Sequence, residues 1–280
     1  MKLSVIHTGL FKLDGGAMYG VVPKQIWNRL NPADELNLCN WAMRCLLVED
    51  GERLILIDTG IGNKQSDKFF GYYHLSQTRA LRQAVEEAGY NLDAITDVLL
   101  THLHFDHCGG AVVKSADGQG FEPSCKNARY WLTEAQWNHA MNPNPREQPS
   151  FLKENFVPLM EHGCLNFISE HQFLGSTVEI RVVNGHTRGM ICPLIHYKDR
   201  KIFYTADLIP SASHIPVNYV MGYDIEPLTV MREKEQILLE AEAEQWLLFY
   251  EHDPVNMATC IERNEKGGFR ASSVMDLATL

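Results

Sequence analysis

The stretch 102–107 holds the densest group of side chains in this chain that could bind metal. It reads His-Leu-His-Phe-Asp-His and directly follows the apolar run 98–100. Imidazole is the commonest protein ligand for transition metals, and packing does not explain the cluster, because each buried polar ring would need its own partner. Two His side chains that alternate at a strand end can share one ion, while the Asp and the last His turn toward a second. The stretch therefore indicates a metal centre.

Composition and charge argue against two classes of partner. The chain has 280 residues, 45% of them hydrophobic, and a formal net charge of −10, with no block of Lys and Arg longer than two. Nucleic-acid-binding proteins normally present a basic face, so we expect no nucleic-acid partner. No apolar stretch approaches the roughly 20 residues of a membrane span, so we expect no membrane partner either.

The cysteines and the amino terminus bear on localisation. Seven dispersed cysteines without a CxxC pair are typical of free thiols in a reducing compartment. The amino terminus has only a short apolar stretch and no small-residue cleavage pattern, which argues against a signal peptide. We therefore expect a soluble cytoplasmic protein.

Strand-like and helical runs recur along the chain and predict how the metal centre is held. We expect one domain, residues 1–280, of the α+β class: a four-layer αββα sandwich with two packed β-sheets and helices outside. The predicted strands are 3–6, 42–48, 54–57, 98–100, 177–183, 191–196, 202–204, 246–250, 257–261 and 269–274. The predicted helices are 77–88, 134–141, 151–162 and 230–245. Thr133, with Gln136 three residues later, is a capping-box signature for the second helix.

Four further polar residues each follow a predicted strand. A rigid strand fixes the backbone at such a position, while the loop after it exposes the side chain. The four residues are Asp58, His186, Asp207 and His252. Each alone is a weak signal, but four such strand endings in a chain that also carries the dense cluster indicate additional metal ligands.

In order and spacing, these residues resemble the five motifs of the metallo-β-lactamase superfamily, over about residues 42–252. The resemblance implies an αββα fold with two metal ions in a cleft at one edge of the sheets. The ligands it implies are His102, His104 and His186 for the first ion and Asp106, His107 and His252 for the second. It also implies that Asp207 bridges both ions, and that Asp58 orients ligands rather than binding metal.

The implied ligand set points to hydrolysis. Imidazole nitrogen and carboxylate oxygen suit Zn²⁺ and also tolerate Fe, Mn or Co, so we expect two divalent ions, with zinc preferred. A structural zinc site is closed by four protein ligands, commonly including cysteine, whereas this set has no cysteine and shares one carboxylate. Two ions that leave room for water can activate it and polarise a substrate carbonyl.

Two segments resemble parts of the superfamily's N-acyl homoserine lactone lactonases, which are quorum-quenching enzymes, especially the YtnP-like group. The apolar segment 13–24 contains Met18 and Tyr19, and the resemblance implies that it helps to form the substrate cleft. The aromatic stretch 69–73, which begins with Phe69 and Phe70, predicts a wall for an apolar acyl chain. We therefore expect a small-molecule lactone or ester as the substrate.

The resemblance implies that a hydroxide bridging the two ions attacks the ester carbonyl, and Asp106 could then carry a proton to the leaving oxygen. Many lactonases have a Tyr shortly after the bridging Asp, but this chain has Leu-Ile-Pro at 208–210. We predict that Tyr223 takes this role by hydrogen bonding to the developing oxyanion.

Two other activities stay open from the sequence. A glyoxalase-type thioesterase would cleave thioesters, although the basic carboxy-terminal region expected for glutathione is here mixed with acidic residues. A mononuclear-iron dioxygenase acting on persulfides would use His102, His104 and Asp207 for one iron and leave the second group without metal. Monomer and homodimer also stay open, since some lactonase relatives pair as dimers.

Overall fold

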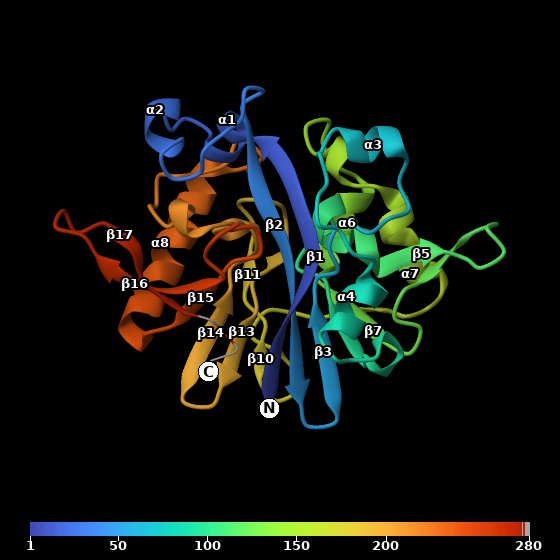
Figure 1. Ribbon diagram of the computed structural model, residues 1–280. Helices are drawn as coiled ribbons and strands as arrows, with labels where there is room; N and C mark the ends of the chain where they lie inside the picture. The colour runs from blue at the N-terminus through green and yellow to red at the C-terminus, as the bar shows by residue number, and fades with distance from the viewer. Residues whose placement is uncertain (276, 278–280) are drawn as a thin grey trace.

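Two β-sheets face each other at the centre of the structure, with helices outside both of them (Figure 1). The computed structural model describes residues 1–275 and residue 277. One layer of helices covers the first sheet, and the long helix α8, Pro227–Glu244, covers the second. This arrangement confirms the predicted αββα sandwich.

The first sheet has six strands in the order β1-β2-β3-β4-β7-β8. Residue alternation gives it two buried faces, because successive side chains in a strand point to opposite sides. In β2, Leu46 and Val48 belong to the core between the sheets, while Cys45 and Leu47 belong to the core under the outer helices. The strands are β1 Lys2–Asp14, β2 Leu38–Asp50, β3 Arg53–Ile57, β4 Asp97–Leu99, β7 Arg129–Leu132 and β8 Leu165–Phe167.

The second sheet has seven strands in the order β17-β16-β15-β14-β13-β10-β9. They are β9 Phe173–Leu174, β10 Val178–Glu179, β13 Leu194–Tyr197, β14 Arg200–Tyr204, β15 Leu247–Phe249, β16 Ala258–Arg263 and β17 Phe269–Met275. Two small ribbons lie beside the sheets. Their strands are β5 Val112–Lys114 with β6 Phe121–Pro123, and β11 Val182–Val183 with β12 Met190–Ile191.

Short helices connect the strands. Those over the first sheet include α4 Leu81–Glu87, α6 Glu134–Met141 and α7 Val157–Glu161. The other α-helices are α1 Gly15–Tyr19, α2 Lys24–Trp27, α3 Asp67–Gly71 and α5 Phe105–Cys108. Single 3₁₀ turns are η1 Leu92–Ala94, η2 Gly109–Ala111, η3 Gln148–Ser150, η4 Lys153–Asn155, η5 Ala206–Leu208 and η6 Ala212–His214. The Thr133 hydroxyl caps α6 as predicted, accepting from Gln136 N at 3.0 Å.

Several predicted elements are shorter or divided in the structure, and proline explains two of these cases. The predicted strand 191–196 is split at Pro193, which has no N–H for the ladder, and the predicted helix 151–162 restarts with Pro158 in its first turn. The predicted strand 177–183 divides between β10 and β11, which pair with different partners. Strands β7 and β8 were not predicted.

The two ends of the sandwich differ. The helices α1 and α2 cover the upper end in Figure 1, whereas the first strand begins at the lower end.

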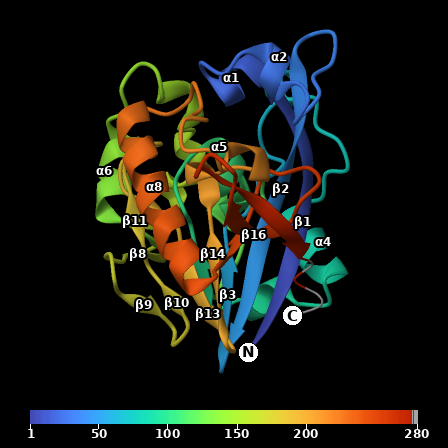
Figure 2. The ribbon, with the colours of Figure 1, turned by 90° about the vertical axis from the view of Figure 1, so that its left-hand side faces the viewer.

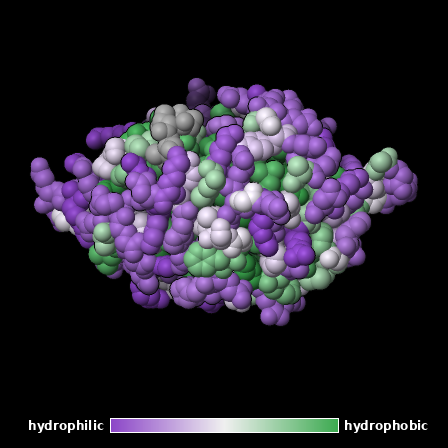
Figure 3. Space-filling model, turned by 90° about the horizontal axis from the view of Figure 1, so that it is seen from below, coloured by the Kyte–Doolittle hydropathy of each residue, from purple (hydrophilic) through white to green (hydrophobic). Residues whose placement is uncertain are grey.

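Seen from below, the molecule presents a mainly hydrophilic surface with apolar side chains in small separate groups (Figure 3). In the part of the chain that the structure describes, no helix is both long and apolar enough to cross a membrane.

Candidate metal centre

The predicted ligands come from the ends of neighbouring strands in both sheets. Strands β3 and β4 are parallel, so Asp58 after β3 and the stretch 102–107 after β4 leave the first sheet at the same edge. In the second sheet β14 and β15 are parallel, and they are followed by Asp207 and His252. His186 lies in the loop between β11 and β12. Helix α5, which carries part of the stretch, lies beyond the ends of the central strands in Figure 2.

Four of the predicted ligands form one buried group. The ligand atoms of His102, His104, His186 and Asp207 all lie within 4.8 Å of one another. His186 Nε2 is 3.2 Å from His104 Nδ1 and 3.2 Å from Asp207 Oδ2. Ligand atoms about 2.0 Å from a tetrahedral zinc ion are about 3.3 Å apart, so this spacing suits such an ion.

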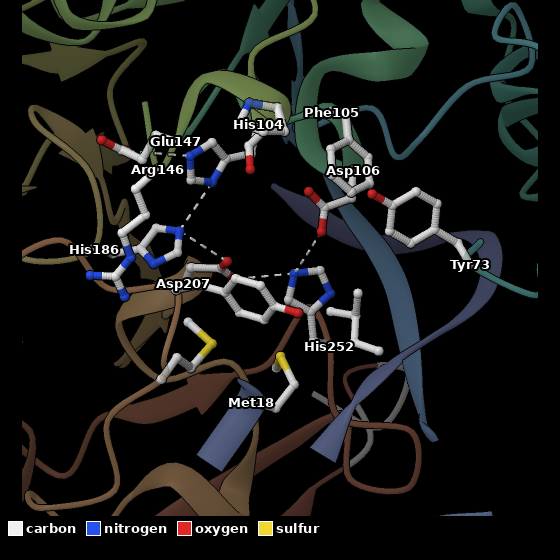
Figure 4. A pocket seen from close by; sticks show the side chains of 15 residues that line it. Met18, Tyr73, His104, Phe105, Asp106, Arg146, Glu147, His186, Asp207 and His252 are labelled. Carbon is white, nitrogen blue, oxygen red and sulfur yellow. Dashed lines mark hydrogen bonds and ion pairs between the residues drawn. The ribbon is translucent and has the colours of Figure 1, made fainter. Parts of the chain in front are cut away.

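The other three predicted ligands, Asp106, His107 and His252, form a second buried group. His107 Nε2 is 3.1 Å from His252 Nε2, and these nitrogens lie 3.8 and 3.7 Å from Asp106 Oδ2. Asp207 Oδ1 is 3.1 Å from His252 Nε2 and 3.5 Å from His107 Nε2. Asp207 therefore presents one oxygen to each group, which is the position of a bridging ligand (Figure 4).

Hydrogen bonds fix which nitrogen of each ring faces the centre. His252 Nδ1 donates to the carbonyl of Ala42 at 2.8 Å, and His186 Nδ1 donates to Asp224 Oδ1 at 2.8 Å. A ring nitrogen that donates a hydrogen bond leaves the other nitrogen with a free lone pair, which is the form that binds metal. The inward Nε2 atoms of both rings are therefore the ones that would bind metal once deprotonated.

Asp58 orients two of the other rings. The Thr101 hydroxyl donates to Asp58 Oδ2 at 2.7 Å and lies 3.0 Å from His102 Nδ1. Because the hydroxyl hydrogen is bound to Asp58, the hydroxyl oxygen accepts from His102 Nδ1 and leaves Nε2 free. Asp58 Oδ2 is also 3.1 Å from His107 Nδ1. Asp58 thus contacts the outer side of the ligands, as the resemblance implies.

The inward atoms fit a pair of cations. Lone pairs that face one another at 3.1–3.2 Å, as in both histidine pairs, repel unless a cation or a proton lies between them. His102 Nε2 and Asp207 Oδ1 are buried and have no hydrogen-bond partner among the described residues. Since buried polar atoms normally have a hydrogen-bond partner, these two atoms indicate that a further group, such as a metal ion, binds here. The donor set suits zinc and accepts Fe, Mn or Co.

Before a metal binds, the charges in the centre favour the ligand form of Asp207 and His102. Burial would raise the pKa of Asp207, but the neighbouring His252, His107 and His186 outweigh it and hold this pKa well below its usual range. Burial lowers the pKa of His102 well below its usual value. Asp207 is therefore charged and His102 is neutral, as ligands must be. Burial would lower the pKa of His107, His186 and His252, but the nearby carboxylates outweigh it and raise these pKa values, so a metal must displace protons from these rings.

Three buried carboxylates behind the ligands were not predicted from the sequence. Besides Asp224, they are Glu147, whose Oε1 lies 3.6 Å from His104 Nε2, and Glu251, whose Oε2 lies 3.0 Å from His107 Nδ1. Glu251 directly precedes a predicted ligand, but no fixed spacing links Glu147 and Asp224 to the motifs. Only the fold brings their loops behind the histidines, so the sequence pattern alone could not find them.

Two glycines let the Asp58 loop pack directly on the segment after α5. A Cβ atom at Gly110 would lie 2.2 Å from the carbonyl oxygen of Thr59, and one at Gly109 would lie 2.1 Å from that of Ile61. Any side chain there would push the two backbones apart. With glycine, Thr59 N donates to the carbonyl of His107 at 2.8 Å, which fixes the Asp58 loop against the ligand helix.

The centre opens onto a pocket of about 230 Å³ (Figure 4). Five of the seven predicted ligands line it, together with Tyr73, Arg146, Glu147, Ser150 and Tyr223. Its apolar walls are formed by Leu13, Met18, Phe105, Pro149 and Met221. A pocket with apolar walls around a polar base is typical of a site for a small organic ligand.

The predicted substrate residues lie in different places. Met18 lines the pocket, whereas Tyr19, Phe69 and Phe70 are not among its lining residues. Tyr19 is buried and stacks on the rings of Trp27 and His214.

Phe69 reaches the pocket wall only through a second ring. It packs edge-on against Phe105, which lines the pocket, with ring centroids 5.3 Å apart, and Phe70 packs against Phe69. The aromatic stretch therefore supports the wall through these two residues, and its last residue, Tyr73, lines the pocket directly.

Tyr223, which was predicted to assist catalysis, lines the same pocket. Burial raises the pKa of its phenol, so the hydroxyl keeps its proton and stays a hydrogen-bond donor at neutral pH. The structure thus brings Tyr223 to the pocket that the predicted metal ligands Asp106, Asp207 and His252 also line.

Comparisons with known proteins agree with this geometry. Residues 44–116 match the model of the metallo-β-lactamase superfamily. A probable metal-dependent hydrolase from Staphylococcus aureus superposes with a TM-score of 0.87 over 98% of both chains, at 24% sequence identity. The chain has the metallo-β-lactamase fold.

Two further proteins that are similar to this chain have activities that differ from each other. AidC, a dizinc quorum-quenching lactonase solved in complex with a product, shares the metallo-β-lactamase fold with a TM-score of 0.80. It is 21% identical, and the match covers 98% of this chain and 95% of AidC. The acyl-coenzyme A thioesterase MBLAC2 of Bos taurus is 28% identical over 183 residues, or 60% of this chain. The match spans 59% of the length of that relative.

In this metallo-β-lactamase fold, a buried histidine ties the amino-terminal segment to the loop after Asp207. His214 Nε2 donates to the carbonyl of Met18 at 2.9 Å, and its Nδ1 accepts from the Ser211 hydroxyl at 2.7 Å. Burial lowers the pKa of His214 to about 3, so the ring is neutral at pH 7. The position of Met18 in the pocket wall therefore depends on an uncharged imidazole.

This histidine predicts a specific acid sensitivity. Because its pKa is lower in the folded chain than its ordinary 6.5, the unfolded chain takes up the proton more readily, and stability falls as pH drops from 6.5 toward 3. The loss attributable to one group is at most about 1.4 kcal/mol per pH unit. We expect His214→Gln to lose less unfolding free energy than the wild type between pH 7.5 and 5.5, measured with urea on metal-free protein. Equal losses would contradict this role.

A fully buried lysine holds the loop that leads to Tyr223 and Asp224. Lys234 of α8 donates its ammonium hydrogens to the carbonyls of three loop residues. The distances are 2.6 Å to His214, 3.0 Å to Pro216 and 2.8 Å to Tyr219. One side chain therefore satisfies three carbonyl groups that would otherwise lack partners.

Removing this ammonium group is expected to cost stability. Leaving a buried acceptor unpaired costs about 1–3 kcal/mol, so Lys234→Met should lower the unfolding free energy by roughly 2–4 kcal/mol in urea denaturation. The exposed Lys266→Met is the matched control and should change it by less than about 0.5 kcal/mol. If both variants were equally stable, the loop would not depend on Lys234.

Proposed function

We propose that this chain is a binuclear metal-dependent hydrolase that opens the ester ring of N-acyl homoserine lactones. The observation that carries the proposal is the position of Asp207 between two groups of ligand nitrogens. Both groups contribute residues to a pocket with apolar walls. Residues 1–280 act in this proposal as one hydrolase domain.

The proposed centre uses all seven predicted ligands, and each has a defined place. His102, His104 and His186 would hold the first ion, Asp106, His107 and His252 would hold the second, and both groups would share Asp207. When two divalent ions are bound, zinc being preferred, they lower the pKa of water and polarise the substrate carbonyl.

The protein supplies the proton transfers and the hydrogen bonds of the reaction. Asp106, whose carboxylate lines the pocket, accepts a proton from the attacking water and passes it to the ring oxygen as that oxygen leaves. The Tyr223 hydroxyl donates a hydrogen bond to the carbonyl oxygen as negative charge develops there. The acyl chain lies against Met18, Phe105 and Met221.

Two observations support a lactone as the substrate. The pocket is small and largely apolar, which suits a neutral acyl lactone. AidC, which shares the fold over nearly the whole chain, acts as a quorum-quenching lactonase.

A thioester is the second candidate substrate. The similarity to MBLAC2, an acyl-coenzyme A thioesterase, favours this reading over 60% of the chain. A mononuclear-iron persulfide dioxygenase has less support, because it would leave the complete second group of ligands without a metal.

The pocket and the cysteines bear on the binding partner and on the cellular location of the protein. We propose a small-molecule partner rather than a macromolecule, since the ligands converge on a pocket. All seven cysteines, each within the described residues, are free of disulfides. This supports a reducing, cytoplasmic location.

Hydrolysis of an N-acyl homoserine lactone by the zinc-loaded protein, followed as proton release, tests the proposal. We expect the wild type to turn over the lactone faster than it turns over an acyl-coenzyme A thioester, and Asp207→Ala to be inactive on both. Turnover of the thioester alone would replace the proposed lactonase by a thioesterase. Activity of Asp207→Ala equal to the wild type would exclude the bridged centre.

A further inference from the structure

The pocket contains a second tyrosine that the sequence does not single out as catalytic. Tyr73 follows α3 and lines the pocket beside the metal ligands. Figure 4 shows its hydroxyl pointing toward the carboxylate of Asp106. Among the residues that the structure describes, none forms a hydrogen bond with this hydroxyl, so it is available to a bound molecule.

The position of Tyr73 is fixed by its backbone and by its ring. Its N–H donates to the carbonyl of Phe70 at 3.0 Å, and its carbonyl accepts from Lys12 N at 2.7 Å. The ring packs against Phe105 with centroids 4.7 Å apart and against Phe69 at 5.1 Å. A donor held in place before the substrate arrives contributes most to catalysis, because no ordering cost remains.

The ring also places the hydroxyl on the side of the second ligand group. Phe105, against which Tyr73 packs, immediately precedes Asp106 in α5. Asp106 Oδ2 lies 3.7 Å from His252 Nε2 in that group. Burial and the charge of Asp106 raise the pKa of Tyr73 to about 12, so the phenol keeps its proton at neutral pH. Tyr73 is therefore a neutral donor beside the residue that carries the proton.

We propose that Tyr73 is a catalytic residue whose hydroxyl donates a hydrogen bond to the leaving ring oxygen, while Tyr223 serves the carbonyl oxygen. This inference rests on the proposed lactonase function. The bond from water oxygen to the carbonyl carbon forms and the bond from that carbon to the ring oxygen breaks. The water proton passes through Asp106 to the ring oxygen. Tyr73 retains its own proton, so no further reactant is needed.

A matched pair of substrates tests the role. In an N-acyl homocysteine thiolactone, a ring sulfur replaces the ring oxygen of the homoserine lactone, while the acyl chain stays the same. A thiolate is a weak hydrogen-bond acceptor and leaves without help. We expect Tyr73→Phe to lower kcat on the lactone roughly 100-fold and on the thiolactone less than about 3-fold. KM should change less than about 3-fold on both.

Tyr223→Phe is the matched control, since the carbonyl oxygen is common to both substrates. It should lower kcat on both by similar factors. Equal losses for Tyr73→Phe on the two rings, or a rise in KM without a fall in kcat, would make Tyr73 a wall of the pocket and overturn the proposal. Both variants should keep the wild-type zinc content and unfolding temperature.

Failure of the proposed function would look different. A wild type that cleaves the thiolactone and leaves the lactone intact would refute the lactonase and, with it, a donor to a leaving oxygen. A wild type that opens both rings, with Tyr73→Phe unchanged on each, would refute the Tyr73 role alone.

Discussion

Replacing Asp106 with asparagine is expected to abolish lactone turnover. Asparagine keeps the shape of the side chain but cannot accept and return a proton, and it is a poorer metal ligand than a carboxylate. Loss of the proton transfer alone is worth about 10²–10⁴ in rate. The same assay should show His104→Ala to be inactive, because that variant removes one of the three nitrogens of the first group.

The control for these variants is the state of the fold. Both residues are buried in the centre, so circular dichroism and thermal unfolding of each variant must match the wild type before its rate is interpreted. The exposed His162→Ala offers a histidine substitution away from the centre and should keep full activity. Metal-dependent activity retained in both Asp106→Asn and His104→Ala would refute the mechanism.

Removing the carboxylate behind His186 is expected to weaken metal binding without removing a ligand. Asp224 is buried, accepts from His186 Nδ1 at 2.8 Å and from Met221 N at 2.8 Å, and so fixes both the ring and the loop. Partners of this kind typically contribute 10–100-fold in metal affinity. We expect Asp224→Ala to raise the zinc dissociation constant by that factor, as measured by competition with a chelator.

The conservative Asp224→Asn separates the two functions of this residue. Its amide oxygen still accepts from one donor, but its lack of charge removes the electrostatic support of the imidazole. An intermediate zinc affinity is therefore expected. Wild-type affinity in Asp224→Ala would mean that packing alone positions His186.

The fold and the residues that gather in the candidate centre were predictable because their signals are local. The stretch 102–107 is dense in one place, and Asp58, Asp207 and His252 each follow a strand whose last three residues are buried and apolar. The strands β3, β4, β14 and β15 overlap continuous apolar runs of the sequence, and the resemblance implied which ligands would share an ion. The short strands β7 and β8 were not predicted.

The support around the ligands was not predictable, because it depends on contacts between distant loops. Glu147 reaches His104 across 43 positions of the chain, and Asp224 reaches His186 across 38. Lys234 donates to backbone carbonyl groups. Every residue has such a group, so the residue types in the sequence do not indicate these partners. For Tyr73, the sequence indicated an aromatic wall, but only the three-dimensional arrangement places its hydroxyl beside Asp106.

Metal content per chain tests the central claim most directly. Protein purified, loaded with zinc and freed of loosely bound metal is measured by elemental analysis, with Asp207→Ala treated in the same way. The bridged centre predicts two zinc ions per wild-type chain and fewer than two in the variant, because the residue that both groups share is lost. One ion in the wild type, or two in the variant, would contradict a centre bridged by Asp207.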